Sequence, residues 1–376
     1  MQRKIFPLSA EKIYMHCYAD LPLHYGKAPR WLFERMVLLA KEIGNILVLE
    51  YGTNGFLERI SDPFWFQALS CTLGFDWHSS GTTTTTCGAL KEALNSANVS
   101  LAIAGGKGKV SRKTPEQVKK LGETLGLKDK QIEKLVYASK MSAKVDNAAL
   151  QDSYTLYHHC IFFDEKGNWV VVQQGMNDET GYARRYHWNS SELNSFIEEP
   201  HSAICCDEKK ELALNLPSKE SGENRKASLD LVKESPRKIE AHIKALAEQK
   251  TLFNWHIQPK EEYLMMPRNI NWEALKEAYE FQPKNYEEFL SIKGIGPNTV
   301  RALALISELI YGSKADWRDP VKYSFAVGGK DGVPFPVKRR VMDKAIEVLS
   351  DAVKQAKLSN YEKLQAIKRL EQLVPD

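Results

Sequence analysis

The side chains best suited to chemistry gather in the first two hundred residues of the sequence. Asp76 and His78 form an Asp-x-His pair on a loop that follows a glycine-ended helix. Carboxylates combined with a histidine suit Mg²⁺ or Mn²⁺, and such ions promote phosphodiester hydrolysis. We expect Asp76, His78 and Asp152 to bind a divalent metal of this kind, with Asp146 as a further carboxylate. The alternative is that Asp76 caps the turn and His78 is hydrogen-bonded beneath the neighbouring tryptophan.

Two adjacent histidines, His158 and His159, are candidate catalytic groups on a hairpin. The stretch HHCIFFDEKGNWVVVQQGMN loosely resembles phosphodiesterases of the phospholipase D kind, in which a histidine is the nucleophile and an asparagine, here Asn177, closes the motif. That family has a lysine two residues after the histidine, where this chain has Cys160 or Ile161. A buried hairpin whose histidines face a polar neighbour is therefore the preferred interpretation.

Cations cluster in the glycine-rich stretch GGKGKVSRK, which follows a predicted strand over residues 99–104. The stretch lacks the pattern of a Walker A loop, but its backbone could form an anion-binding nest. Together with two later arginines, these cations predict a basic groove in which neighbouring tyrosines stack bases. The residues are Lys107, Lys109, Arg112, Lys113, Arg184 and Arg185. The alternative is that they are solvated side chains on the surfaces of helices.

A second glycine-containing stretch, SIKGIGPNTV, separates a short charged helix from a long apolar one. Its two glycines permit positive φ and a close backbone approach, and Pro297 suits the first position of a helix. N–H groups at the start of that helix would then face a phosphate. The stretch resembles the helix-hairpin-helix motif, which implies contacts with the DNA backbone from Lys293, Gly294, Ile295, Gly296, Asn298 and Thr299. The alternative is a plain turn with a glycine cap.

A third idea concerns the stretch KDGVPFPVKRRVMDKAI, where Asp331 precedes Arg339 and Arg340. The order resembles DNA glycosylases of the helix-hairpin-helix class, whose catalytic aspartate follows the hairpin. The spacing here is longer, and Asn298 stands where bifunctional members have a lysine. A simple turn is therefore the preferred interpretation of Asp331.

These candidates are distributed over a chain with mixed helix and strand signals. The apolar arms YHHCIFF and NWVVVQQ flank a turn at residues 164–167, which predicts a hairpin inside a sheet. Helix caps at Ser235, Asn271 and Asn285 predict that the later part is helical. We expect an α+β, mixed fold: an N-terminal α/β domain over residues 1–206, a polar linker or exposed flap over 207–234, and an all-α helix-hairpin-helix domain over 235–376.

The composition of the chain limits the classes of protein to which it could belong. The 376 residues carry 52 Lys and Arg against 48 Asp and Glu, a mildly basic balance that is compatible with nucleic acid. Six cysteines without CxxC spacing predict reduced intracellular thiols rather than a disulfide framework. The sequence has no apolar run of the roughly 18 residues that a membrane span needs, and no signal-peptide pattern. We expect a soluble, cytoplasmic protein.

Several stretches together carry a family resemblance. They are ADLPLHYGKAPRWLFERM, DPFWFQAL, GFDWHSSGTTTT, GGKGKVSRKTPE, VYASKMSAKVDNAALQD and YHHCIFFDEKGNWVVVQQGMN. These stretches resemble the family called domain of unknown function number seven hundred and sixty-three, known mainly from archaea and some thermophilic bacteria. The resemblance covers most of residues 18–205 and the helical end. It implies a prokaryotic intracellular protein and brings no activity with it.

One hypothesis joins these features: a DNA-binding protein of repair or recombination that acts as a metal-dependent nuclease. A Mg²⁺ or Mn²⁺ ion would be its cofactor, and single-stranded or structured DNA and repair proteins would be its partners. The expected catalytic residues are Asp76, His78, Asp146, Asp152, His158 and His159. Two alternatives from other classes stay open. One is a non-catalytic DNA-binding adaptor, and the other is base excision without nuclease activity.

Overall fold

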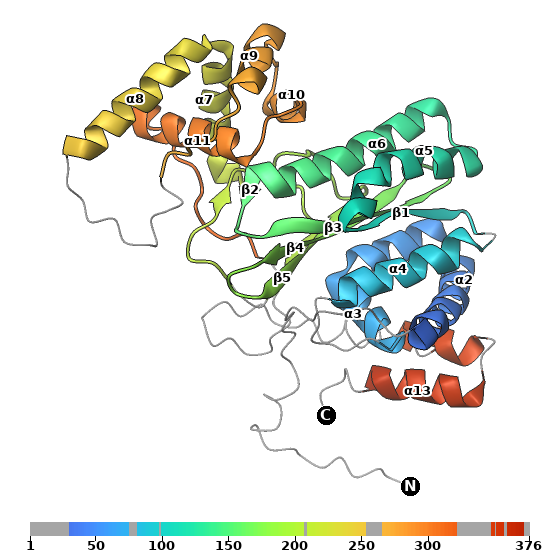
Figure 1. Ribbon diagram of the computed structural model, residues 1–376. Coiled ribbons are helices and arrows are strands. Elements are labelled where there is room, and N and C mark those ends of the chain that lie inside the picture. The colour runs from blue at the N-terminus through green and yellow to red at the C-terminus, as the bar shows by residue number, and fades with distance from the viewer. Residues whose placement is uncertain are drawn as a thin grey trace, which may run out of the picture.

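The computed structural model describes residues 30–74, 81–97, 99–206, 209–252, 265–321, 347–349, 351–356 and 359–371. Asp76, His78 and Asp331 lie outside these described residues. The described chain forms a five-stranded sheet with helices on both faces and a group of helices at one end (Figure 1). This arrangement confirms the expected mixture of helix and strand.

The main sheet is antiparallel and has the strand order β1-β3-β4-β5-β6. Its strands are β1 (Leu101–Lys107), β3 (Thr155–Asp164), β4 (Trp169–Asn177), β5 (Tyr182–Asn189) and β6 (Ala203–Cys205). β3 and β4 form the predicted hairpin, and the Asp164 carboxylate closes its turn by accepting the N–H groups of Lys166 and Asn168. Both arms have a neighbouring strand on their outer side, so the hairpin lies inside the sheet, as its nearly continuous apolar arms predict.

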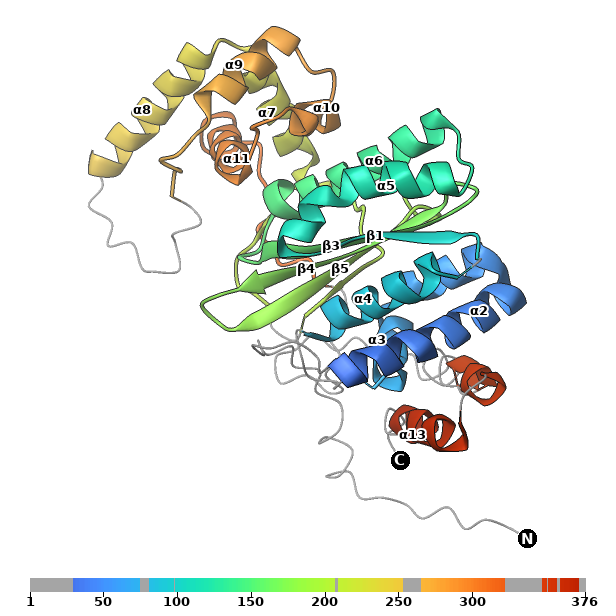
Figure 2. The ribbon, with the colours of Figure 1, turned by 45° about the vertical axis from the view of Figure 1, so that its right-hand side comes forward.

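Different parts of the chain cover the two faces of the sheet (Figure 2). α2 (Arg30–Ser61), α3 (Pro63–Thr72) and α4 (Gly81–Asn95) cover one face, and α5 (Thr114–Thr124) and α6 (Asp129–Lys144) cover the other. Neighbouring residues of β3 follow this division, since successive side chains of a strand point to opposite faces. Phe162 packs in the core beneath α2–α4, and Phe163 packs in the core beneath α5 and α6.

The edge strand β1 approaches β3 closely at Gly105. A Cβ atom on Gly105, whose φ is +108°, would lie 2.1 Å from the carbonyl oxygen of His159, so no other residue fits there. After β1 the chain enters the 3-10 turn η1 (Gly108–Lys113), which contains most of the basic stretch. The close pairing therefore holds η1 beside the beginning of β3, where Lys107 is opposite His158.

A group of helices forms the upper part of the molecule in Figure 1. Its members are α7 (Gly222–Lys233), α8 (Pro236–Leu252), α9 (Trp272–Phe281), α10 (Tyr286–Ser291) and α11 (Pro297–Tyr311). Two of the predicted caps are confirmed, because the side chain of Asn271 accepts the N–H of Ala274 and the side chain of Asn285 accepts that of Glu288. These caps stabilise the starts of α9 and α10.

The segment expected as a polar linker over residues 207–234 is largely folded instead. It contains β7 (Leu214–Asn215), which pairs with β2 (Leu150–Gln151), the 3-10 turn η3 (Lys219–Ser221) and α7. Leu231 and Val232 are buried, and the Ser228 and Ser307 hydroxyls are hydrogen-bonded between α7 and α11. Most residues of α7 are polar because they lie on its exposed face, and only a narrow face is apolar. The segment was therefore expected to be a linker.

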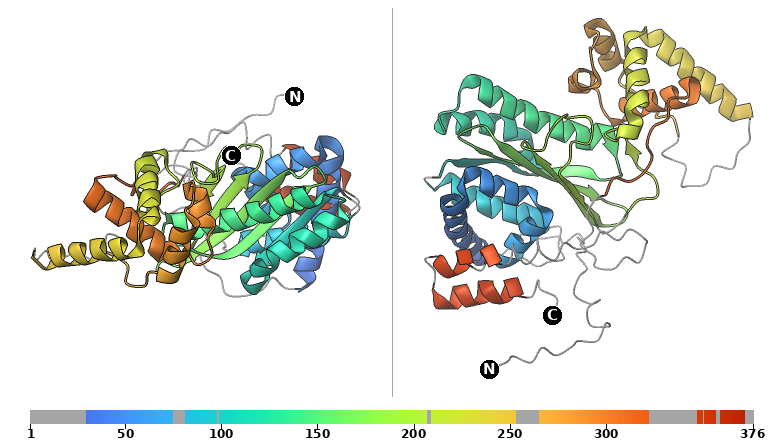
Figure 3. Two further views of the ribbon diagram at one scale, coloured as in Figure 1. Left: turned by 90° about the horizontal axis from the view of Figure 1, so that it is seen from above. Right: turned by 180° about the vertical axis from the view of Figure 1, so that it is seen from behind.

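The last described helical segments lie with the N-terminal helices rather than with α8–α11 (Figure 3). Residues 347–349 and 351–356 and α13 (Asn360–Glu371) contribute Leu349, Val353 and Ala366 to the core beneath α2–α4, and α13 contacts α3. The expected helical unit over residues 235–376 is thus divided between two parts of the molecule. None of the described helices is long and apolar enough to cross a membrane.

One hydrophobic core joins the sheet to the group of helices. It extends from Ile161 and Phe163 of β3, through Val145 and Ala148 of the π-helical turn η2 (Val145–Ala149), to Ile295 between α10 and α11. Polar contacts reinforce this connection. The Tyr137 hydroxyl of α6 donates to Glu287 at 2.6 Å, and the Gln151 amide donates to the carbonyl of Pro297 at 2.8 Å. The α10–α11 loop is therefore fixed beside α6.

Candidate functional site

A cavity of about 940 Å³ lies where α6, η1, β3, β4 and the α10–α11 loop meet. We call it the groove. Three stretches that the sequence singled out separately reach it: the basic stretch through Arg112, the histidine pair through His158 and His159, and the glycine-containing loop through Lys293. The fold therefore brings together residues that are far apart in the chain.

The groove is lined by cations and lacks acids. Arg112 of η1, Lys140 and Lys144 of α6, and Lys293 of the α10–α11 loop line it, and none of its lining residues in the described ranges is Asp or Glu. Burial lowers the pKa of Lys144, whose ammonium donates to the carbonyl of Ile292 at 3.2 Å. Cations that face a cavity without carboxylates give it a positive potential, which attracts anions.

The α10–α11 loop reaches the groove through Lys293, and its glycine backbone follows directly in the chain. Gly294 is exposed with φ +87°, and Gly296 is half-buried in an extended conformation. Ile295 is buried in the shared core, and its N–H bonds to the carbonyl of Ile292 at 3.3 Å. Among the described residues, the N–H groups of Gly294, Gly296 and Asn298 have no protein acceptor, and no side chain caps α11. These N–H groups are free to bind an anion at the positive end of the helix dipole.

Two of the loop residues that were predicted to contact the DNA backbone have structural roles instead. Ile295 is only 1% exposed and anchors the loop in the core. Thr299 is likewise buried, and its hydroxyl accepts the N–H of Asn271, which fixes the start of α9 against α11. Neither side chain is available to a ligand, so the loop offers Lys293, its glycine backbone and Asn298.

A chain of hydrogen bonds leads from the groove into the sheet. The Ser139 hydroxyl is 2.8 Å from His159 Nε2, and His159 Nδ1 is 2.8 Å from Gln173 Oε1. The amide nitrogen of Gln173 then donates to Asp146 Oδ2 at 2.6 Å. Asp146 also accepts from Trp188 Nε1 at 3.0 Å, and its other oxygen lies 2.5 Å from His201 Nε2. Ser139, His159 and Gln173 line the groove.

This chain fixes the tautomer of His159. A carboxylate only accepts hydrogen bonds, so Asp146 faces the amide nitrogen of Gln173 and leaves the amide oxygen toward His159. His159 Nδ1 must then carry the proton, and Nε2 is left to accept the Ser139 hydroxyl. Burial lowers the pKa of His159, which keeps the ring neutral near pH 7. A hydroxyl directed at a neutral, oriented imidazole is the arrangement of an activated serine nucleophile.

Asp152 and Arg184 lie in a different buried cluster. Arg184 donates to Asp152 at 2.9 Å and to Asp319 at 2.7 Å, and the Tyr186 hydroxyl donates to Asp152 at 2.7 Å. Arg184 and its two carboxylates are buried. The carboxylate of Asp152 is therefore already paired with a cation rather than directed into the groove. The other two residues of the expected metal set, Asp76 and His78, lie outside the described residues.

Arg185 is also buried rather than available to DNA. Its guanidinium donates to Gln67 at 3.1 Å and lies 4.7 Å from the centre of the Phe66 ring, beneath α3. The pair Arg184-Arg185 looks like a basic surface in the sequence, but the two residues lie on a strand inside the sheet. Lys107, Lys109, Arg112 and Lys113 are exposed, as the basic-groove hypothesis requires.

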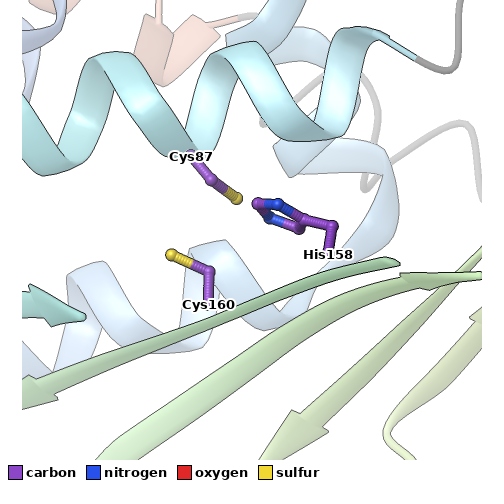
Figure 4. Close-up of side chains that lie close together, drawn as sticks. All are labelled: Cys87, His158 and Cys160. Carbon is purple, nitrogen blue, oxygen red and sulfur yellow. The ribbon is translucent and has the colours of Figure 1, made fainter. Parts of the chain in front are cut away.

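His158 faces the opposite side of β3 from His159. Its ring lies close to the thiols of Cys87 on α4 and Cys160 on β3, and the ligand atoms of these three residues lie within 4.8 Å of one another (Figure 4). All three residues are buried. Sequence reasoning missed the two cysteines, because Cys87 is distant in the chain. The His-x-Cys spacing on a predicted strand was a usable signal, since it places both side chains on one face.

These features define a mixed α/β protein with an acid-free, cation-lined groove between its sheet and a group of helices. The chain belongs to the family described as "Protein of unknown function (DUF763)", which matches residues 17–337. No curated protein and no solved structure matches the sequence.

Proposed function

We propose that the groove binds the sugar–phosphate backbone of DNA. The observation that carries this proposal is the convergence of Arg112, Lys140, Lys144 and Lys293 on one cavity without carboxylates. The unpaired N–H groups at the start of α11 add donors that suit phosphate oxygens. Both kinds of donor contact the backbone rather than base edges, so we expect binding with little sequence preference.

Aromatic side chains favour single-stranded or unpaired segments as the ligand. Tyr137 and Tyr157 line the groove together with the cations, and Lys107 lies 5.5 Å from the centre of the Tyr157 ring. Bases stack on aromatic rings without regard to sequence, while neighbouring cations follow the backbone. Unpaired bases are available for this stacking, whereas the bases of a duplex are already stacked.

Fluorescence anisotropy of labelled single-stranded, duplex and nicked oligonucleotides tests this proposal. Lys140→Ala and Lys293→Ala should each weaken binding by roughly 3–10-fold, the loss of one charged contact. Each should also reduce the slope of log affinity against log salt by about 0.7 on a single strand. Lys134→Ala is the matched control, because Lys134 is an exposed lysine of α6 that does not line the groove. Equal losses from Lys134 and Lys140 would exclude the groove as the binding site.

A second candidate function is hydrolysis of the bound strand, which the Ser139–His159–Gln173–Asp146 chain favours. In this hypothesis Ser139 Oγ attacks phosphorus while its proton passes to His159 Nε2. The bond from phosphorus to one sugar oxygen breaks, and that oxygen takes the proton from His159. Water then attacks the phosphoserine with His159 as base, and Ser139 leaves with its proton restored. The role expected for His159 becomes that of a base rather than a nucleophile.

Cleavage assays with and without Mn²⁺ distinguish a nuclease from an adaptor. Ser139→Ala should abolish cleavage and leave the dissociation constant within about twofold, because only the nucleophile is lost. Ser142→Ala is the control, since Ser142 is a buried serine of the same helix whose hydroxyl contacts the backbone of Ser139. Binding without turnover in the wild type would favour the non-catalytic adaptor. Cleavage that survives in Ser139→Ala would exclude the serine mechanism and direct attention to the metal-dependent alternative.

A further inference from the structure

Three donor side chains converge in the core between α4 and the sheet (Figure 4). Cys87 extends from α4 toward the sheet, and His158 and Cys160 extend toward α4 from neighbouring same-face positions of β3. Each residue is 1% exposed, and each offers a ligand atom within 4.8 Å of the other two. Two sulfurs and one imidazole nitrogen are the donors that Zn²⁺ takes most often in proteins.

His158 supplies an independent sign that something is bound there. Neither of its ring nitrogens has a hydrogen-bond partner, although both are buried. Among the four buried histidines of the described chain, the other three each use at least one ring nitrogen: His159 with Ser139 and Gln173, His187 with Ile60, and His201 with Asp146. Buried polar atoms are almost always satisfied, so an imidazole without partners points to a missing ligand.

The chemistry of the surroundings selects the kind of ligand. The three donors lie in an apolar core with Leu90 and Phe162, where a net charge is costly. A divalent cation bound by two thiolates and a neutral imidazole has no net charge. Mg²⁺ and Ca²⁺ prefer oxygen ligands, whereas thiolates select Zn²⁺ and similar soft ions.

We propose that Cys87, His158 and Cys160 bind one Zn²⁺ ion, which joins α4 to β3 behind the groove. Tetrahedral Zn²⁺ places its sulfur ligands about 3.8 Å apart, so small side-chain rotations would bring the three donors to it. The fourth position is taken by water or another small ligand. His158 is also a lining residue of the groove, so the ion stiffens the groove wall. This site has donors different from the Mg²⁺ or Mn²⁺ set expected from the sequence, and it does not depend on nucleic-acid binding.

Cobalt substitution of the reduced full-length protein tests the proposal directly. Protein freed of metal with a chelator is titrated with Co²⁺ and then with Zn²⁺. We expect thiolate-to-cobalt charge-transfer absorption and the visible bands of tetrahedral Co²⁺, both saturating at one ion per chain and both removed by Zn²⁺. Absence of these bands in folded, reduced protein would overturn the proposal.

Matched variants locate the ion. Cys87→Ala and Cys160→Ala should lose the charge-transfer absorption or weaken Co²⁺ binding at least tenfold. Cys71→Ala should retain both, because Cys71 is a buried cysteine of the same core but not of the cluster. His158→Phe removes both nitrogens and keeps an aromatic ring, so folding is preserved while Co²⁺ affinity falls. Unchanged cobalt spectra in the Cys87, Cys160 and His158 variants would show that the ion binds elsewhere and would overturn the assignment.

Discussion

Cations in the interior of the sheet and cations in the groove differ in whether they have carboxylate partners. In the interior, Arg184 lies between Asp152 and Asp319, and the three side chains are buried. In the groove, Lys140 and Lys293 face a cavity with no carboxylate among the described residues that line it. A buried cation with partners stabilises the fold only as part of its cluster, whereas cations without partners are available to an outside anion. Basic residues of one chain thus divide into structural and binding groups.

Removing Arg184 should have the largest effect on stability. Arg184→Leu leaves two carboxylates buried without a cation, which we expect to lower the free energy of unfolding by about 3–5 kcal/mol. Urea denaturation measures the loss. Arg30→Leu is the control, because Arg30 pairs with Glu34 and both side chains are exposed, so little change is expected. If Arg184→Leu were as stable as the wild type, the contrast between the two groups of cations would be lost.

Acid should destabilise the interior of the sheet, where several histidines are buried. Burial, together with the nearby charges of His159, Lys107 and Lys91, lowers the pKa of His158 to about 3, and burial also lowers the pKa values of His159 and His187. Below the unfolded value near 6.5, the unfolded chain therefore binds protons that the folded chain does not. Stability is complete above about pH 6.5 and falls by about 1.4 kcal/mol per pH unit for a histidine whose folded pKa lies far below this value, such as His187.

Urea denaturation at pH 7.5, 6.5 and 5.5 measures this dependence in a window where most carboxylates stay ionised. His187→Phe removes one titrating group outside the proposed zinc site, so its stability should fall less steeply between pH 6.5 and 5.5 than that of the wild type. A wild type equally stable at all three pH values would mean that the histidines take up protons in the folded state.

The smallest expected effect comes from a substitution in the α10–α11 loop and tests whether this loop belongs to the DNA-binding surface. Gly294→Ala forces a side chain into φ +87° and places its Cβ 2.9 Å from Asn271 Nδ2, so we expect a loss of about 1–2 kcal/mol and weaker DNA binding. Gly312→Ala imposes similar strain at φ +71° on the far end of α11, where nothing lies within 4 Å. It should lower stability without changing affinity. Equal affinities for the two variants would remove the α10–α11 loop from the proposed interface.

Local signals predicted the secondary structure well where they were strong. The turn after Asp164 and the caps at Asn271 and Asn285 satisfy backbone groups within a few residues, and Pro297 at the start of α11 has no N–H that needs a partner. Such contacts can be read without knowing the fold. The packing of α7 could not be predicted in this way, because it depends on contacts with Ser307 and its neighbours on α11, which are distant in the chain.

The candidate site was predictable only in parts. The sequence indicated the basic stretch, the histidine pair and the glycine-containing loop separately. It did not predict that Lys293 and Arg112 face one cavity, because this depends on the core shared by the sheet and the helices. Asp146 was placed with a metal and instead orients His159 through Gln173. Composition alone does not show whether an arginine on a strand is exposed, which is why Arg184 was assigned to DNA.

The last described helices pack beside α3, and this packing affects how the protein folds during its synthesis. Leu349, Val353 and Ala366 complete a core whose other members come mainly from α2–α4 and from β1, β3 and β4. At the roughly 5–20 residues per second of translation, α2–α4 wait tens of seconds for this cover. During that interval the apolar surface that these helices will cover is exposed on the nascent chain.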